Sequence, residues 1–280
     1  DLARSGLYEA ARRGLASFGT EINPAAYQMG RTYELINIPP KERAHALAAV
    51  DQAVTRACSP LFAGRSPDEL GKRLVNLASS IDGILERQLL QTLVIRADLA
   101  RKALDDRRIL ALWAKLRSLV ADLPSSTRAV KLWNADARRT PEQISHMGVD
   151  LVLTSPPYIN VFNYHQQFRV SAESLGWNLL NVARAELGSN RKHRQNRFLT
   201  VIQYCVDMTE ALTSAAQATR SSSRIIAVVG RESLVRATPF FNGAIVFRLA
   251  TKAVGLRCLC RQERVFKNRF GQLIFEDILH

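Results

Sequence analysis

Long hydrophobic runs are absent from the sequence, and none approaches the ~20 apolar residues that a membrane-spanning helix requires. The first residues, Asp1-Leu2-Ala3-Arg4, also lack the basic-then-apolar layout of a secretory signal peptide. Both absences count against a membrane-spanning or secreted protein. We therefore expect a cytoplasmic protein with no membrane partner.

Cysteine is scarce, and its spacing does not match a common metal site. The four cysteines are Cys58, Cys205, Cys258 and Cys260, and only the last two lie close together in the sequence. A second such pair, which a zinc site of this type would need, is missing. We predict reduced structural thiols and no bound metal.

Positive charge, in contrast, is abundant. The chain has 280 residues, with 39 Lys and Arg against 25 Asp and Glu, which gives a formal net charge of +14. This excess favours a polyanionic partner, nucleic acid first, over a generically basic soluble surface. The length suits one large α/β domain or a domain with a substantial insertion.

The first half of the sequence changes from α/β to helical character. Apolar periodicity predicts a helix over 5–13 and a short strand over 14–22. Residues 39–126 are rich in Ala, Leu, Arg and Asp in long amphipathic stretches, with almost no β-branched alternation. We expect this segment to be an all-helical insertion.

The second half returns to alternating strands and helices. We predict strands over 129–134, 149–154 and 224–230, helices over 197–218 and 240–254, and a final hairpin with strands 256–266 and 273–279. This order predicts a mostly parallel sheet with an antiparallel C-terminal hairpin. Residues 1–38 and 127–280 would form one domain that carries the insertion 39–126.

The strongest motif is Ser155-Pro156-Pro157-Tyr158, hereafter the proline loop, which follows the apolar strand 149–154. Ligands of open α/β sheets bind beyond the carboxyl ends of the strands, so a reaction site is expected there. An exocyclic base amine is a poor nucleophile until acceptors hold its N–H bonds in a pyramidal geometry. The Ser155 hydroxyl and the Pro156 carbonyl are suitable acceptors.

Tyr158 adds an aromatic face on which a base removed from the duplex could stack, an interaction worth roughly 1–3 kcal/mol. The alternative is a Pro-Pro turn that merely ends a strand, with Tyr158 in the core. The surrounding motifs favour the catalytic interpretation.

The proline loop resembles the catalytic motif of the DNA amino-methyltransferase family, in which Asp, Asn or Ser precedes Pro-Pro and an aromatic residue. The resemblance implies a Rossmann-like class I methyltransferase sheet, base flipping, and methyl transfer from S-adenosylmethionine. Ser in first position favours cytosine N4 as the acceptor, with adenine N6 as the alternative. Carbon-5 cytosine methylation is disfavoured, because it needs a cysteine after a proline and none of the four cysteines has one.

Two upstream segments resemble the family's cofactor motifs. In Gly19-Thr20-Glu21-Ile22-Asn23-Pro24, the resemblance assigns Glu21 to the ribose hydroxyls of S-adenosylmethionine, with Asn23 beside it. In Asn134-Ala135-Asp136-Ala137, it assigns Asp136 to the adenine amino group.

The family's first motif, a glycine-rich loop after the central strand, is matched only in part. Asp1, Ser5 and Gly6 resemble its remnants, and the central strand expected before them is missing from the 280 residues. We expect either an incomplete N-terminal part of the methyltransferase domain or a protein that has lost methyl transfer. The second possibility is a catalytically inactive DNA-binding module.

The resemblance also implies double-stranded DNA as partner, with a cognate restriction endonuclease as a further candidate. The helical insertion 39–126 is a candidate target-recognition or DNA-clamping element, and a basic stretch at 184–197 is a candidate phosphate-binding loop. Segment 228–232 resembles the strand and turn beside the target-base pocket, although Arg231 and Glu232 could instead pair structurally. The residues expected to contact nucleic acid are Asn160, Tyr164, Arg191, Lys192, Arg194 and Arg197, and Asn163 and His165 are expected to line the site with them.

Overall fold

The computed structural model describes residues 2–58, 66–100, 104–140, 144, 147–159, 166–187, 196–268 and 270–280, and gives the backbone alone for 2–5 and 184. Two compact units divide the chain. Unit 1 comprises residues 3–134 and 165–179, and unit 2 comprises residues 135–164 and 180–280. Within the described ranges, every helix is too short or too polar to cross a lipid bilayer.

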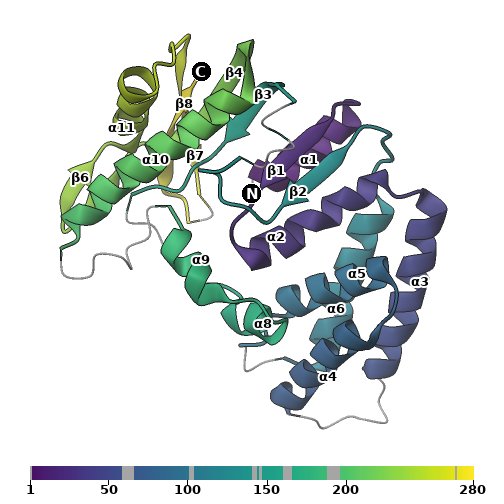
Figure 1. The fold of residues 1–280 in the computed structure, drawn as a ribbon. Coiled ribbons are helices and arrows are strands. Elements are labelled where there is room, and N and C mark those ends of the chain that lie inside the picture. The colour runs from purple at the N-terminus through teal and green to yellow at the C-terminus, as the bar shows by residue number, and fades with distance from the viewer. Residues whose placement is uncertain are drawn as a thin grey trace. The chain divides into compact units, whose positions relative to one another are not determined.

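Unit 1 combines a helical bundle with one parallel pair of strands (Figure 1). Its elements are α1 (Leu2–Arg12), β1 (Ser17–Thr20), α2 (Pro24–Gly30), η1 (Arg31–Asn37), α3 (Pro40–Ala57), α4 (Pro67–Ser80), α5 (Ile84–Ala97), α6 (Asp106–Ala121), β2 (Val130–Trp133) and α8 (Arg169–Ser174). The described part of segment 39–126 is helical apart from connections, as predicted. Strands β1 and β2 lie in the same unit as these helices.

Local sequence signals account for where these helices begin. The Ser66 hydroxyl accepts the backbone N–H of Glu69, whose carboxylate accepts the N–H of Ser66, so the two residues form a capping box. Asp105 caps α6 through its side chain, which accepts the backbone N–H of Arg108. The apolar faces of the helices then form one core, with Val50, Leu93 and Leu116 fully buried.

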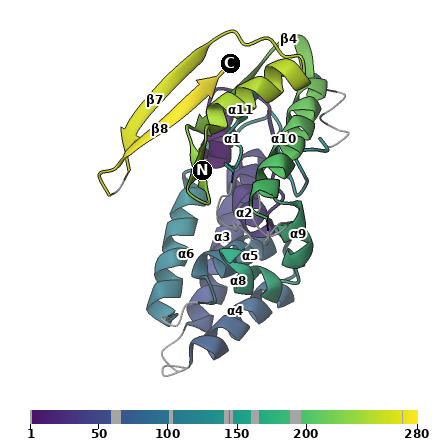
Figure 2. The same ribbon diagram turned by 90° about the vertical axis from the view of Figure 1, so that its left-hand side faces the viewer.

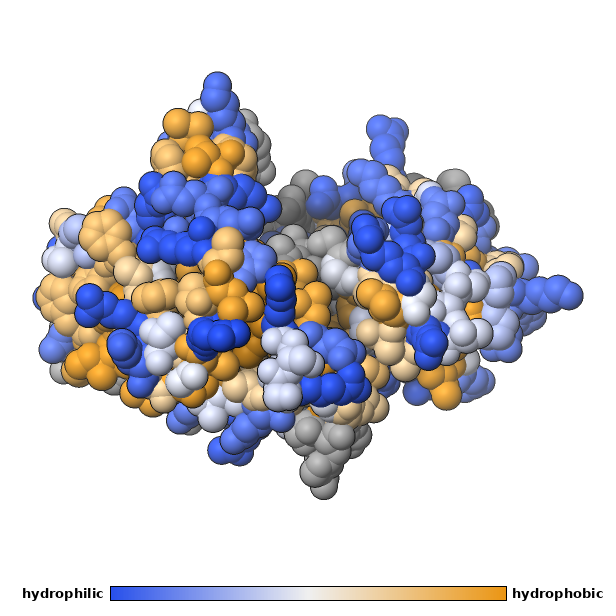
Figure 3. All heavy atoms as spheres, turned by 90° about the horizontal axis from the view of Figure 1, so that it is seen from above, coloured by the Kyte–Doolittle hydropathy of each residue, from blue (hydrophilic) through white to orange (hydrophobic). Residues whose placement is uncertain are grey.

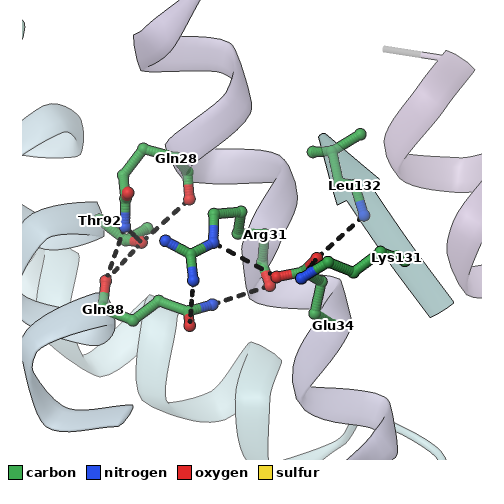
Figure 4. A network of polar contacts seen from close by, with 7 residues as sticks. All are labelled: Gln28, Arg31, Glu34, Gln88, Thr92, Lys131 and Leu132. Carbon is green, nitrogen blue, oxygen red and sulfur yellow. Dashed lines mark hydrogen bonds and ion pairs between the residues drawn. The ribbon is translucent and has the colours of Figure 1, made fainter. Parts of the chain in front are cut away.

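A polar network connects the bundle to the strand pair (Figure 4). Gln28, only 1% exposed, donates from Nε2 to the Gln88 carbonyl at 3.0 Å and to the Thr92 hydroxyl at 3.3 Å. Glu34 accepts the backbone N–H of Leu132 at 2.9 Å, which connects η1 to β2. Buried polar groups are therefore satisfied across three segments distant in sequence.

Unit 2 contains a four-stranded mixed sheet. Its elements are β3 (Val149–Thr154), α9 (Leu179–Ala185), whose first residue belongs to unit 1, α10 (Phe198–Ala218), β4 (Thr219–Gly230), β5 (Ser233–Val235), β6 (Thr238–Phe240), α11 (Asn242–Arg248), the π-helix η4 (Leu249–Ala253), β7 (Arg261–Lys267) and β8 (Leu273–Leu279). The strand order is β3-β4-β8-β7, with β3 and β4 parallel and both other pairings antiparallel. The predicted strands, helices and C-terminal hairpin are thus confirmed in type and approximate position.

The prediction of a mostly parallel sheet with an antiparallel hairpin is confirmed in part. Among the described residues there are two parallel pairs, β1–β2 and β3–β4, and they belong to separate sheets. The antiparallel β7–β8 hairpin extends well beyond α11 (Figure 2). The chain has a mixed α/β fold.

The two faces of β3 differ in how well they are covered. Helices α10 and α11 pack on the sheet through a core that includes Tyr204, Val229 and Val246. Leu151 and Leu153 share the other face of β3 and remain 53% and 48% exposed. Parallel strands are usually buried on both faces, so this exposure is unusual.

Apolar side chains are exposed elsewhere in unit 2 as well. Phe266, Phe270 and Leu273 lie on or beside the hairpin turn and are 41%, 71% and 54% exposed. On the surface drawn in Figure 3, hydrophobic residues are exposed among hydrophilic ones.

We predict that Gln28→Ala lowers the free energy of unfolding of unit 1 by about 1–3 kcal/mol, because buried partners on α5 lose a donor. Gln52→Ala is the matched control: this residue is exposed, and the change should stay within about 0.5 kcal/mol. Urea unfolding monitored by circular dichroism measures both. Equal stability of the two variants would contradict a structural role for the network in Figure 4.

Candidate functional site

The proline loop leaves the sheet at the carboxyl end of β3, as the sequence predicts for a site of this fold class. Ser155 is exposed, whereas Pro156 is buried and Pro157 and Tyr158 are partly buried. Since β3 and β4 are parallel, with Thr154 opposite Ala227, the loop lies beside the carboxyl end of β4. Ser155 is therefore the exposed polar residue of a loop whose other three residues are buried or partly buried.

Asn242 holds the far end of this loop. It is fully buried at the start of α11, and its Oδ1 accepts the backbone N–H of Ile159 at 3.3 Å. Its Nδ2 donates to the Gly230 carbonyl at 3.2 Å and to the Ser233 hydroxyl at 2.9 Å. A single buried amide therefore connects the loop, the end of β4 and the start of β5.

Tyr158 packs against Gly230 at the end of β4. A Cβ at position 230 would lie 2.6 and 2.7 Å from the Tyr158 ring atoms Cε2 and Cζ, so only glycine allows this approach. The Tyr158 hydroxyl is 3.5 Å from Glu276 Oε1 on β8, and Glu276 also pairs with Arg264. The ring is thereby oriented at the edge where the carboxyl ends of β3 and β4 meet.

Asp136 is part of an ion-pair cluster within unit 2. Its carboxylate accepts the Arg138 backbone N–H at 2.9 Å and guanidinium N–H groups at 2.5–3.1 Å. Arg138 also donates to buried Asp207 at 2.5 Å and to the Ala185 carbonyl at 3.0 Å. Burial alone would raise the pKa of Asp136, but the hydrogen bonds from Arg138 outweigh it and hold that pKa below its usual value.

Glu21 and Asn23 lie in unit 1, directly after β1. Glu21 Oε1 accepts the backbone N–H of Asn23 at 2.8 Å, which fixes the carboxylate at the end of the strand. Asn23 caps α2, since its Oδ1 accepts the N–H groups of Ala25 and Ala26. Its side chain therefore has a local structural role, which the sequence analysis did not assign.

The remaining predicted cofactor residues are at the N-terminus. Ser5 and Gly6 lie within helix α1, and nothing lies within 4 Å of a Cβ added at Gly6. Asp1 is outside the described residues.

Most of the residues predicted to contact nucleic acid also fall outside the described ranges, namely Asn160, Tyr164, Arg191, Lys192 and Arg194, together with Asn163 and His165. Arg197 is described, and it immediately precedes α10 with a partly buried side chain. Arg231 pairs with Glu263 on β7 at 2.8 Å rather than with Glu232. The structural pairing considered for Arg231 thus exists with a different partner.

Three residues of this site were not predicted from the sequence as parts of it: Asn242, Glu276 and Tyr204. Tyr204 is fully buried on α10, and burial together with the nearby Cys205 and Tyr158 raises the pKa of its hydroxyl. Only Gly230 carried a sequence signal, because segment 228–232 resembles the family's turn beside the base pocket. Asn242 and Glu276 contact the loop from positions remote in sequence, and Tyr204 belongs to the apolar core cluster against which Tyr158 packs.

No protein-family model, curated protein or solved structure matches this chain. The resemblance to amino-methyltransferases therefore rests on the sequence motifs alone.

We predict that Gly230→Ala destabilises unit 2 by about 1–3 kcal/mol, because the new methyl group overlaps the Tyr158 ring. Gly6→Ala is the control, since the added methyl group is in open space within a helix and should be neutral or stabilising. Denaturant unfolding of both variants gives the comparison.

A double-mutant cycle isolates the contact. In a Tyr158→Ala background the ring is gone, so Gly230→Ala should cost at least about 1 kcal/mol less. An unchanged cost in that background would show that Tyr158 and Gly230 are not in contact.

Proposed function

We propose that this chain is the catalytic part of a DNA methyltransferase that transfers a methyl group from S-adenosylmethionine to an exocyclic base amine, with cytosine N4 preferred. The observation that carries the proposal is the proline loop at the carboxyl end of a parallel strand, anchored by Asn242 and by the Tyr158–Gly230 contact. Double-stranded DNA is the proposed partner. A cognate restriction endonuclease is a further proposed partner, by family resemblance alone.

The residues of the loop have complementary proposed roles. The Ser155 hydroxyl and the Pro156 carbonyl accept the two N–H bonds of a flipped base and direct its nitrogen lone pair outward. The Tyr158 ring supports the base by stacking, an interaction worth roughly 1–3 kcal/mol. Asn242 acts as a positioning residue, because it is fully buried and fixes the loop through its hydrogen bond with Ile159.

When bound, S-adenosylmethionine supplies an activated methyl group. The described residues fit this cofactor only in part. Glu21, at the end of a parallel strand with its carboxylate fixed by a backbone N–H, suits a ribose diol. Asp136 does not suit the adenine amino group in the arrangement described, because its carboxylate already accepts several N–H groups of Arg138.

The proposed class I methyltransferase sheet includes a central strand that carries the donor loop. Two features of β3 support a strand at that position. Within the described residues β3 has a strand on one side alone, and Leu151 and Leu153 on β3 are half exposed. A neighbouring strand with its helix would pair with the other side and cover these leucines.

Adenine N6 remains the alternative target of methylation. The Ser155 hydroxyl and the Pro156 carbonyl could accept the N–H bonds of either base amine. A second candidate function is a DNA-binding module without methyl transfer, favoured by the engagement of Asp136 with Arg138. Calorimetric titration of the protein with S-adenosylmethionine and separately with duplex DNA distinguishes the two functions. Binding of both ligands supports the enzyme, whereas binding of DNA alone supports the inactive module.

We predict that Ser155→Ala lowers the methylation rate by about 10²–10³-fold, because the substrate amine loses a preorganised partner. DNA affinity should be unchanged. Ser174→Ala, an exposed serine on α8, is the control and should retain full activity. Sequencing of DNA from expressing cells, with detection of modified bases, reports base and position together, and full activity of Ser155→Ala would refute the catalytic assignment.

A further inference from the structure

A cavity of about 370 Å³ lies at the amino-terminal end of β4, the end opposite to the proline loop. Its walls come from α10, β4, α11, η4, segment 256–259 and the end of β8, all within unit 2. Arg224 lines the cavity and lies six steps of extended strand, about 20 Å, from Gly230, whereas the lining also reaches Ala227, which pairs with Thr154. The residues that line the cavity do not include the proline loop, Gly230 or Asn242, so the cavity is a separate site.

The apolar part of the cavity lining is mostly aliphatic. It is formed by Leu212, Ile225, Val246, Ala250 and Leu279, with Phe247 as an aromatic contribution. Binding sites for small molecules generally combine such an apolar surface with a few polar groups that fix the ligand's orientation. The apolar part of a ligand here would be a flexible chain rather than a stacked ring.

The polar groups come from an irregularity in β4. Val149 pairs with Thr219 and Leu151 with Arg224, so residues 220–223 bulge out opposite Asp150 alone. Ser223 stabilises the bulge, since its hydroxyl donates to the Val149 carbonyl and accepts the Arg220 N–H. The bulge places serine and arginine side chains at the rim of the cavity.

The charge at this rim is only partly neutralised. Arg220 pairs with Asp150. Arg224 and Arg257 also line the cavity and are exposed, and within the described ranges neither has an ion-pair or hydrogen-bond partner. Two unpaired guanidinium groups beside an aliphatic cavity are complementary to an oxyanion on an apolar chain.

We propose that this cavity binds a small amphiphilic anion, with its aliphatic chain in the cavity and its carboxylate or phosphate between Arg224 and Arg257. The site is independent of methyl transfer and of the residues at the proline loop. Carboxylate and phosphate headgroups share the chemistry that the two arginines recognise.

Isothermal titration with sodium decanoate, below the concentration at which it forms micelles, tests the proposal. We expect saturable 1:1 binding that strengthens about three- to fourfold for each added methylene between octanoate and decanoate. Decanol should bind at least about tenfold more weakly, because it lacks the charge. Decyl phosphate in a parallel titration shows which headgroup is preferred.

Three variants locate the ligand. Arg224→Gln combined with Arg257→Gln should weaken decanoate binding by about tenfold or more. Ala250→Leu should weaken decanoate binding, because the larger side chain takes up part of the cavity. Arg248→Gln removes an exposed arginine of α11 outside the cavity and should leave the affinity unchanged.

Thermal unfolding of the ligand-free variants separates loss of binding from loss of folding. The proposal is overturned if decanoate fails to bind the parent protein. It is also overturned if decanoate binds the folded double arginine variant or the folded Ala250→Leu variant as tightly as the parent.

Discussion

The parallel pairing of β3 with β4 is the constraint on which the rest of unit 2 depends. Because the two strands run in the same direction, the proline loop emerges where β4 ends, and Gly230 and Asn242 can reach it. The same pairing creates the bulge at the other end of β4, since four residues there face Asp150 alone. One strand pair thus positions both the proposed catalytic loop and the cavity with its arginine rim.

Elements whose sequence pattern is local were predictable from the sequence. Strand 149–154 was found with its observed bounds, because an apolar run ended by two prolines leaves few alternatives. The long helix α10 and the C-terminal hairpin follow from periodicity and turn residues in the same way. The division into two units was less predictable, because it depends on contacts such as that between Glu34 and Leu132, 98 residues apart.

In the candidate site, too, the part with a local sequence pattern was predictable and the contacts between distant residues were not. The loop itself is a contiguous motif, whereas its anchors lie 83 residues away at Asn242 and 118 residues away at Glu276. Asparagine and glutamate at such positions carry no signal of their own in a single sequence. Gly230 differs, because a glycine that ends a buried strand often indicates a close approach, which here is to the Tyr158 ring.

Asp136 would have to turn away from Arg138 before its carboxylate could accept a ligand's amino group. Arg138 has two further partners, Asp207 and the Ala185 carbonyl, so it would remain paired if Asp136 turned towards a ligand. The large penalty for an uncompensated buried charge would therefore not arise. The pKa of Asp136 lies below its usual value, so the carboxylate is ionised at neutral pH and able to accept a hydrogen bond from an amino group. That lowered pKa depends on Arg138, so in the arrangement described Arg138 both keeps Asp136 charged and occupies its carboxylate oxygens.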